Sequence, residues 1–471
     1  MKFSITLSSI SKQLSEVASI ACSAPNKEDI TQNILINVTG NELTFKATNY
    51  NIELQTKIPV MDVVSEGETT VNAVKLKDTL ANLDINSDVV FELANEKLII
   101  SNSSVSHENS ETDNTYVKSV FIAYYELEIF TKENDEKQFK KTISKTFKEL
   151  SSKGFNRVTV QVRPCADAFY KSSYFPVSEY CFGYQGSELI YDPLEIMVEC
   201  AHKYNLSIEA WINPYRVLQR NDFSALSENN IALKWKDSEK LIVTDGAIYF
   251  NPAYKEVTDL IVNGVKEIVS NYDIDSICFD DYFYPTKDKN IDKSAYKSYK
   301  DSGGKKSLQD FRRDNINNMV KSVYSAIKSI KSNVTFGISP ASNIDYDYST
   351  IYADVIKWSR NEGYVDYICP QIYFGFKNEN QPFMQTTKLW CDNATCKLYV
   401  ALPMYKSGQK DEFAGESGKN EFIREKDIVS RQVTYLSKLE QVSGFYIFSY
   451  TSLKDNEETS NLYSAMQNSS Q

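Results

Sequence analysis

From about residue 118 onward, short apolar runs alternate with longer segments in which apolar residues recur at helical spacing. This alternation is typical of parallel β-strands that are joined by helices. Eight apolar runs fall within about 350 residues, and eight is the number of strand–helix units in a (β/α)8 barrel. The predicted strands are 119–125, 157–162, 207–212, 276–279, 335–338, 364–369, 398–402 and 444–449.

The segments between these runs have the features of helices. Phe139, Ile143 and Phe147 recur at helical spacing, and Asp192 followed by Pro193 is typical of a helix start. An open, doubly wound sheet would show a similar alternation, but no glycine-rich phosphate loop follows the first predicted strand. We therefore predict an α/β fold for residues 118–471, a (β/α)8 TIM barrel.

Residues 1–103 follow a different pattern. Apolar residues alternate at period two, for example over 3–7 and 43–47, which is typical of strands with one buried face. Two helices are predicted, at 10–22 and at 74–83. We expect an α+β domain made of a small antiparallel sheet and two helices.

Residues 104–117 are polar and are predicted to be a linker between the two domains. The stretch from Lys2 to Cys22 faintly resembles a lipoprotein signal, but Lys12 and Glu16 interrupt the apolar segment that such a signal needs. We interpret it as an amphipathic helix of the mature domain and predict no signal peptide. On this interpretation the chain is expected to be cytoplasmic. No run of about 18 apolar residues exists, so no membrane span is predicted.

The composition of the chain argues against several classes of function. The 471 residues carry a formal net charge of −11, which argues against a general nucleic-acid binder and against attraction to anionic membranes. The chain has only two histidines, His107 and His202, and no pair of cysteines spaced as C-x-x-C. A histidine-rich zinc site and a Ser-His-Asp triad are therefore not expected. We predict neither a metal site nor a cofactor site.

Two adjacent acids, Asp280 and Asp281, directly follow the predicted strand 276–279 and precede the aromatic run 282–284. Repulsion and partial desolvation at the edge of an apolar strand raise the pKa of at least one of the two carboxyls. Such a pair can keep one acid protonated near neutral pH while the other stays ionised. We expect the aromatic run to form a floor for a sugar ring. An ordinary acidic loop or a helix N-cap is the alternative.

The other predicted strands end in polar and aromatic side chains as well. A barrel places its chemistry at the carboxyl ends of its strands, and here those ends carry Arg, Asn, Gln, Tyr and Asp but no His. Carboxylates for acid–base work, amides and arginine for hydroxyl groups, and aromatics for ring faces match a glycosidase. A single polar residue at a strand end would not carry this inference, because strand ends commonly meet water.

The motifs at these ends resemble glycosyl-hydrolase-like family 10. They are Ala210-Trp-Ile-Asn-Pro-Tyr-Arg-Val217, Val162-Arg-Pro with Asp167-Ala168, Phe279-Asp-Asp-Tyr-Phe-Tyr-Pro285 and Cys369-Pro-Gln-Ile-Tyr-Phe374. The resemblance covers roughly residues 118–465 and implies a (β/α)8 fold and hydrolysis of glycosidic bonds. It further implies an enzyme exported to the bacterial envelope, with a polysaccharide substrate such as peptidoglycan glycan strands stripped of their stem peptides.

The N-terminal part resembles the first domain of the bacterial DNA polymerase III β sliding clamp. The matching segments are Met1-Lys-Phe-Ser-Ile, Leu43-Thr-Phe-Lys-Ala-Thr-Asn-Tyr-Asn-Ile-Glu-Leu54, Gly67-Glu-Thr-Thr-Val-Asn-Ala73 and Leu98-Ile-Ile-Ser101. A clamp chain uses three such domains to close its ring, so we expect no working clamp from one. Clamps are cytoplasmic, whereas the barrel family is usually exported, so the two resemblances imply different compartments.

We assign acid catalysis to Asp281, with Asp280 supporting it or exchanging roles with it. A second carboxylate is expected from another strand end, either Asp167, which has Arg163 nearby in sequence, or Glu126. The residues expected to bind substrate are Arg163, Trp211, Asn213, Tyr215, Arg216, Tyr282, Gln371, Tyr373 and Tyr405.

Two other functions compete with a glycosidase. A non-catalytic carbohydrate-binding barrel would share the aromatic residues but would tolerate the loss of both aspartates. A replication-associated protein acting through residues 1–103 would dimerise or contact polymerase subunits, but the other clamp domains and a basic tract are missing. The sequence thus favours a polysaccharide partner over nucleic acid, and it indicates no particular oligomeric state.

Overall fold

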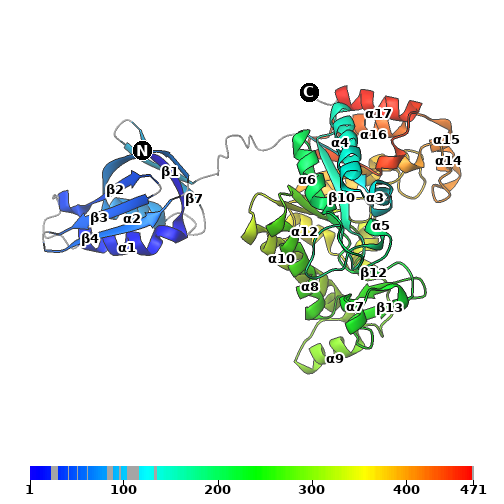
Figure 1. The fold of residues 1–471 in the computed structure, drawn as a ribbon, viewed down its shortest axis with the longest axis horizontal. Helices are drawn as coiled ribbons and strands as arrows, with labels where there is room; N and C mark the ends of the chain where they lie inside the picture. The colour runs from blue at the N-terminus through cyan, green and yellow to red at the C-terminus, as the bar shows by residue number, and fades with distance from the viewer. Residues whose placement is uncertain are drawn as a thin grey trace. The chain divides into compact units, whose positions relative to one another are not determined.

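The computed structural model describes two compact units, Met1–Asn114 and Thr115–Gln471 (Figure 1). The predicted linker, 104–117, lies outside the described residues except for its last two positions, and Val117 already begins a strand. The described ranges are 1–22, 30–40, 42–49, 51–60, 62–81, 88–94, 97–102, 116–131 and 135–468.

The N-terminal unit contains two antiparallel four-stranded sheets, ordered β5-β1-β7-β8 and β4-β3-β2-β6. Its strands are β1 (Lys2–Thr6), β2 (Asn33–Thr39), β3 (Glu42–Thr48), β4 (Glu53–Pro59), β5 (Asp62–Ser65), β6 (Gly67–Asn72), β7 (Asp88–Ala94) and β8 (Lys97–Asn102). Its helices are α1 (Leu7–Cys22), η1 (Ile30–Gln32) and α2 (Ala73–Ala81).

The period-two pattern does place one face of each sheet in a core. Phe3 and Phe91 stack with ring centroids 5.0 Å apart, and Ile36 and Phe45 are fully buried beside α1. Two details of the prediction are wrong. Leu7 begins α1 rather than ending the first strand, and the single expected sheet is two sheets. The predicted end of the second helix, at residue 83, lies outside the described residues.

The second unit is the predicted barrel, with eight parallel strands closed in the order β9-β10-β11-β15-β16-β17-β18-β19. Its strands are β9 (Val117–Ile122), β10 (Arg157–Arg163), β11 (Ser207–Ile212), β15 (Ser276–Phe279), β16 (Thr335–Ile338), β17 (Tyr367–Ile368), β18 (Lys397–Leu402) and β19 (Val442–Ile447). The strand predicted over 364–369 is reduced to two residues, and Pro370, which has no N–H for the ladder, follows closely.

Helices surround the strands of the barrel unit (Figure 1). Asp192 caps α6 by accepting the backbone N–H groups of Leu194 and Glu195, with Pro193 as the first helical residue, as the sequence predicts. The helices are α3 (Tyr124–Thr131), α4 (Glu136–Ser152), α5 (Glu179–Phe182), α6 (Pro193–Lys203), α7 (Ile231–Lys234), α8 (Lys255–Asn271), α9 (Lys293–Asp301), α10 (Leu308–Ile330), α11 (Ile344–Ser349), α12 (Val355–Arg360), α13 (Phe383–Asn393), α14 (Gly415–Gly418), α15 (Glu421–Arg424), α16 (Ile428–Leu436) and α17 (Glu457–Asn468).

Long connections follow the carboxyl ends of the strands and build the mouth of the barrel. The connection after β11 carries a small antiparallel sheet, ordered β12-β14-β13. The remaining short elements are β12 (Arg216–Leu218), β13 (Leu241–Val243), β14 (Ile248–Phe250), η2 (Phe223–Ala225), η3 (Met404–Lys406) and η4 (Tyr450–Ser452).

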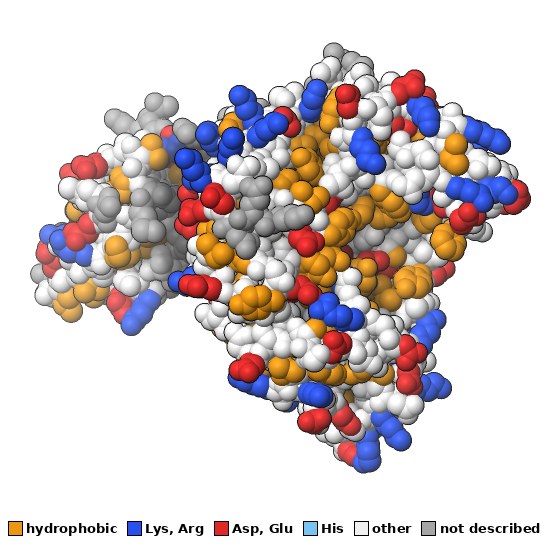
Figure 2. All heavy atoms as spheres, turned by 45° about the vertical axis from the view of Figure 1, so that its right-hand side comes forward, with side chains coloured by type: hydrophobic (Ala, Val, Ile, Leu, Met, Phe, Trp, Pro, Cys, Tyr) orange, Lys and Arg blue, Asp and Glu red, His pale blue; other side chains and the backbone are white. Residues whose placement is uncertain are grey.

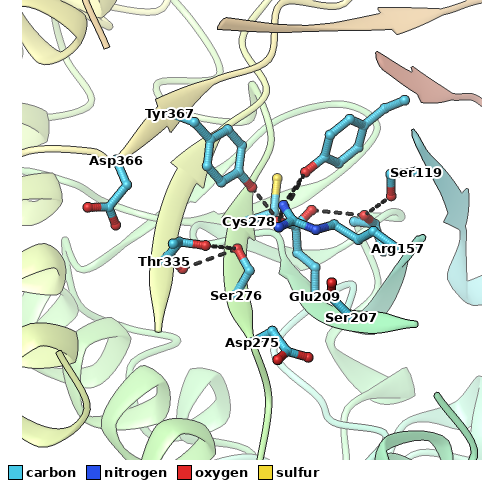
Figure 3. Close-up of polar contacts among 12 residues, drawn as sticks. Ser119, Arg157, Ser207, Glu209, Asp275, Ser276, Cys278, Thr335, Asp366 and Tyr367 are labelled. Carbon is cyan, nitrogen blue, oxygen red and sulfur yellow. Dashed lines mark hydrogen bonds and ion pairs between the residues drawn. The ribbon is translucent and has the colours of Figure 1, made fainter. Parts of the chain in front are cut away.

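The barrel interior holds a buried polar cluster around Glu209 on β11 (Figure 3). One carboxylate oxygen of Glu209 accepts hydrogen bonds from Tyr367 Oη at 2.5 Å and Tyr446 Oη at 3.2 Å, and Arg157 Nη1 lies 3.4 Å from it. The other oxygen of Glu209 accepts a hydrogen bond from Thr159 Oγ1 at 2.8 Å. Successive strand residues alternate between faces, so Trp211, two residues further along β11, also points inward, one layer nearer the carboxyl ends.

Candidate active site

A cleft of about 320 Å³ opens at the carboxyl ends of the barrel strands, where this fold carries its chemistry. Figure 2 shows hydrophobic side chains around a hollow on the face of the barrel unit that it brings forward. The residues that line the cleft are Phe121, Tyr124, Tyr125, Gln161, Trp211, Arg216, Gln219, Asp280, Asp281, Tyr282, Ser339, Gln371, Tyr373 and Phe448.

Asp280 is held in a fixed orientation directly after β15. Trp211 Nε1 donates to Asp280 Oδ2 at 3.1 Å, and Asn213 Nδ2 donates to the same oxygen. Asn213 is fixed in turn, because its Oδ1 accepts hydrogen bonds from Gln161 Nε2 and from Arg216 Nη2. Amide, indole and guanidinium groups from neighbouring strand ends therefore determine where this carboxyl points.

Asp281 lies beside Asp280 and is more accessible, since it is half-buried whereas Asp280 is only 3% exposed. Burial, reinforced by repulsion from Asp281, raises the pKa of Asp280 to about 7. Burial also raises the pKa of Asp281, and a hydrogen bond with Gln371 opposes that rise. Adjacent carboxyls of this kind titrate as a pair, so the cleft can hold a proton near neutral pH.

Arg216 places a fixed positive charge next to this pair. Its Nε donates to the backbone oxygen of Pro164 at 2.7 Å, and its guanidinium stacks over the ring of Tyr282 at 4.9 Å. The side chain is 5% exposed, so the charge cannot swing away into solvent. Arg216 lowers the pKa of Asp280 against the larger effect of burial.

Aromatic side chains form an apolar surface within the cleft. Phe121 lies 5.2 Å from Trp211, and Phe448 lies 5.6 Å from Tyr373, between ring centroids. Such packing fixes the rings and leaves apolar faces for a ligand. The cleft thus combines apolar ring faces with a few convergent polar groups, the usual composition of a small-molecule or sugar site.

The structure brings most of the sequence-predicted site residues together. Those that line the cleft are Asp280, Asp281, Trp211, Arg216, Tyr282, Gln371 and Tyr373. Asn213 stands directly behind Asp280 and is 1% exposed. Tyr405 lies at the edge, with its ring 5.8 Å from that of Tyr373.

Arg163 lies on the other side of the barrel wall. The register of β10 against β11 shifts between Gln161 and Arg163, so that Gln161 pairs with Trp211 while Arg163 pairs with Ile212. The shift turns Arg163 outward, where its guanidinium stacks on Phe175 at 4.5 Å. Arg163 is therefore placed to support the barrel wall rather than to bind substrate in the cleft.

The two other predicted acids also lie outside the cleft lining. Asp167 Oδ2 accepts Ser178 Oγ at 3.0 Å and Gln185 Nε2 at 3.3 Å, and burial raises the pKa of Asp167 to about 6. Glu126 is fully buried and accepts hydrogen bonds from Ala123 N at 2.7 Å and from Thr451 N at 2.7 Å. These contacts make Asp167 a loop anchor and Glu126 a tie between the start of α3 and the segment after β19.

The expected aromatic floor at 282–284 is only partly correct. Tyr282 lines the cleft, but Phe283 and Tyr284 are each 1% exposed and pack in the core. Tyr215 is fully buried as well and does not line the cleft. A run of aromatics in a loop cannot present every ring to one side, because successive side chains point in different directions.

Several cleft residues were missed by sequence reasoning. Phe121 and Gln161 lie on the inward face of β9 and β10, and Phe448 follows β19. The period-two alternation, counted back from each strand end, could have found the first two. A further acid, Asp347 on α11, is fully buried, and both its burial and the charge of Asp281 raise its pKa. Asp347 lies in a helix beyond its strand, so no strand-end signal marks it.

The described part of the chain contains neither a cluster of metal ligands nor a membrane-spanning helix. No three His, Cys, Asp or Glu side chains gather there as ligands for a metal ion. No helix in that part has the length and apolar character needed to cross a membrane.

Comparison with known proteins gives relatives for both units. Residues 1–115 match the model of the DNA polymerase III beta subunit, N-terminal domain. A solved structure of Caulobacter crescentus pol III beta is 26% identical, with a TM-score of 0.21, and the match covers 22% of this chain and 28% of that one. The family-model match over residues 1–115 confirms the predicted likeness of the N-terminal unit to the first clamp domain.

The barrel unit resembles two curated bacterial proteins. Glycosyl hydrolase YngK of Bacillus subtilis is 36% identical over 343 residues, which cover 68% of this chain and 65% of YngK. Glycosyl hydrolase DigH of Escherichia coli K12 is 30% identical over 325 residues, 64% of this chain and 73% of DigH. The chain thus matches less than two thirds of the length of YngK.

The family model for Glycosyl hydrolase-like 10 matches residues 116–415, more than half of the chain. This range contains every strand of the barrel except β19, together with the carboxyl pair and most of the cleft lining. The chain belongs to the Glycosyl hydrolase-like 10 family.

Proposed function

We propose that the barrel unit is a glycosidase that hydrolyses the glycan strands of peptidoglycan. The observation that carries this proposal is the pair formed by Asp280 and Asp281, whose raised pKa values leave a proton available in an aromatic-lined cleft. Glycoside hydrolysis needs a carboxylic acid to protonate the leaving oxygen and a carboxylate facing the anomeric carbon. The names of YngK and DigH, both glycosyl hydrolases, support the same class of reaction.

Asp281 is the proposed general acid. The hydrogen bonds that Trp211 and Asn213 donate to Asp280 oppose the rise of its pKa, and Asp281 is the more accessible of the two acids, so we assign delivery of the shared proton to Asp281. Asp281 gives this proton to the leaving oxygen as the C–O bond breaks. The ionised Asp280 then faces the positive charge that develops on the sugar, and a water molecule that adds to the anomeric carbon returns its proton to the pair.

Binding is assigned to groups that surround the pair. Arg216 offers N–H donors and Gln371 offers its amide oxygen to sugar hydroxyl groups, since Gln371 Nε2 already donates to the backbone oxygen of Ser339 at 2.9 Å. Trp211, Tyr282 and Tyr373 offer ring faces. Asp167 and Glu126 are assigned to holding the surrounding loops, since both oxygens of Glu126 and the Oδ2 atom of Asp167 accept hydrogen bonds from neighbouring protein groups.

The test is to incubate the full chain with purified, peptide-free peptidoglycan glycan and to measure new reducing ends. The matched control is Asp281→Asn, which keeps the size of the side chain and removes its acid. We expect release by the parent and a rate lower by about 10²- to 10⁴-fold in the variant, the usual contribution of a general acid. Full activity in Asp281→Asn would contradict the assignment.

A non-catalytic sugar-binding barrel is the second candidate. It is favoured by one observation: the two acids among the lining residues of the described cleft are adjacent in sequence, whereas glycosidases set their two carboxyls about 5–9 Å apart. If parent and Asp281→Asn both bind the glycan equally and neither releases reducing ends, the binding function replaces the enzymatic one.

A further inference from the structure

Four exposed tyrosines surround the mouth of the barrel. Tyr125, Tyr282, Tyr346 and Tyr405 are 44%, 43%, 45% and 36% exposed. Isolated exposed apolar residues are ordinary, but several flat rings around one cleft suggest a ligand. Tyrosine suits a sugar, because its face is apolar and its hydroxyl group can stay in water.

The barrel topology places Tyr125 and Tyr346 on opposite walls. Tyr125 follows β9 and Tyr346 follows β16, and these two strands are four positions apart in the closed order of eight, so they face each other. Tyr282 follows β15, the neighbour of β16. Tyr405 follows β18, which lies two positions from both β9 and β16, so its proximity to Tyr125 rather than the strand order groups it with Tyr125.

Contacts with the carboxyl pair and with the cleft place all four rings close to the same opening. Tyr125 and Tyr282 both line the cleft. Tyr405 packs against Tyr373 at 5.8 Å and is close enough to Tyr125 that the two phenols influence each other electrostatically. Tyr346 lies close enough to Asp281 that the charge of Asp281, after burial, raises the pKa of Tyr346.

We propose that the cleft continues across the barrel mouth as a sugar-binding groove, with Tyr282 and Tyr346 on one side of the carboxyl pair and Tyr125 and Tyr405 on the other. The ligand is a glycan chain that occupies both sides at once and is cut internally. This inference rests on the proposed glycosidase function, and it adds that the enzyme binds several sugar units on both sides of the bond that it cuts. A site for a terminal sugar would need ring faces on one side of the acids and a closed wall on the other.

A matched control lies on the same helix as Tyr346. Tyr348, also on α11, is 43% exposed, but its ring is covered by the guanidinium of Arg313 at 4.0 Å. Removing either ring takes a similar exposed tyrosine from the same short helix. Only the loss of Tyr346 removes a ring from the groove.

The experiment compares Tyr125→Ala, Tyr346→Ala and Tyr348→Ala with the parent, all as full chains, on long peptide-free glycan strands. We expect the parent to produce fragments of intermediate length at the earliest times. We expect Tyr125→Ala and Tyr346→Ala to raise KM about tenfold with little change in kcat, since a lost stacking contact of this kind is worth up to about 1.5 kcal/mol. Tyr348→Ala should match the parent.

Binding of the same strands is measured separately with each tyrosine change placed in the Asp281→Asn background. Weaker binding in the Tyr125 and Tyr346 variants but not in the Tyr348 variant supports the groove even if no protein releases reducing ends, in which case only the proposed glycosidase fails. Release of terminal units alone by the parent, or unchanged KM and binding in both groove variants, overturns the groove while leaving the glycosidase intact.

Discussion

Two sites with buried acids lie one above the other in the barrel, and their carboxyl groups have opposite kinds of neighbour. In the interior, Glu209 is matched by the cation of Arg157 and by three hydroxyl donors (Figure 3). At the mouth, Asp280 and Asp281 stand side by side, and burial raises the pKa of both. Both carboxylate oxygens of Glu209 are therefore occupied by protein groups. The Asp280–Asp281 pair instead holds a proton and includes a carboxyl group that is accessible from the cleft.

The difference shows how burial alone fails to identify a reactive acid. A buried carboxyl group whose oxygens are contacted by a cation and by several donors contributes to structure. A buried carboxyl that faces another acid holds its proton more tightly and can deliver it.

The largest effect should come from replacing the acids of the cleft pair. Asp280→Asn and Asp281→Asn should each lower the rate of reducing-end release by about 10²- to 10⁴-fold. Because the two acids share one proton, the double variant should lose no more than the worse single variant. Rates measured on the three proteins at one pH test this, and losses that multiply would show that the two acids act independently.

The next effect concerns stability. Glu209→Leu should lower the free energy of unfolding of the barrel unit by about 3–5 kcal/mol, because Arg157 is left buried without its partner. The double variant Arg157→Leu/Glu209→Leu should recover part of this loss. Denaturant midpoints followed by a barrel-specific signal would provide the comparison. A double variant less stable than Glu209→Leu would contradict the account of a charge pair.

The smallest effect is a shift in pH dependence. The acid form of the pair is present below its raised pKa, so the parent's kcat/KM should fall as the pH rises through about 7. Trp211→Phe removes a donor that favours ionised Asp280, so the pKa of the pair should rise and the fall should move to higher pH by about one unit. A profile that moves to lower pH would reverse the assigned role of this hydrogen bond.

The sequence predicts the barrel and the centre of the cleft well, for a physical reason. Strand ends are set by apolar runs, so an acid directly after Phe279 has to appear at the carboxyl edge of β15. Trp211 is also predictable, because it lies on a strand whose inward face is fixed by alternation.

The sequence predicts poorly wherever the backbone departs from regular alternation. A single register shift in β10 turns Arg163 away from the cleft, and no pattern of residues in the sequence predicts this shift. Asp167 follows the same strand, but its loop folds back so that Ala168 pairs with Val177, which buries the carboxyl against Ser178. Long-range closure of loops decides these positions, and local sequence does not encode it.

The most direct test compares two single variants that make the same chemical change, one at each site. Asp281→Asn and Glu209→Gln each replace a carboxyl group by an amide, and both the rate of reducing-end release and the denaturant midpoint are measured on the full chains. The account predicts that Asp281→Asn loses activity at an unchanged midpoint, whereas Glu209→Gln loses stability and keeps its activity per folded molecule. Equal activity losses at equal stability, or an active Asp281→Asn, would contradict the separation of a reactive pair at the mouth from a structural acid beneath it.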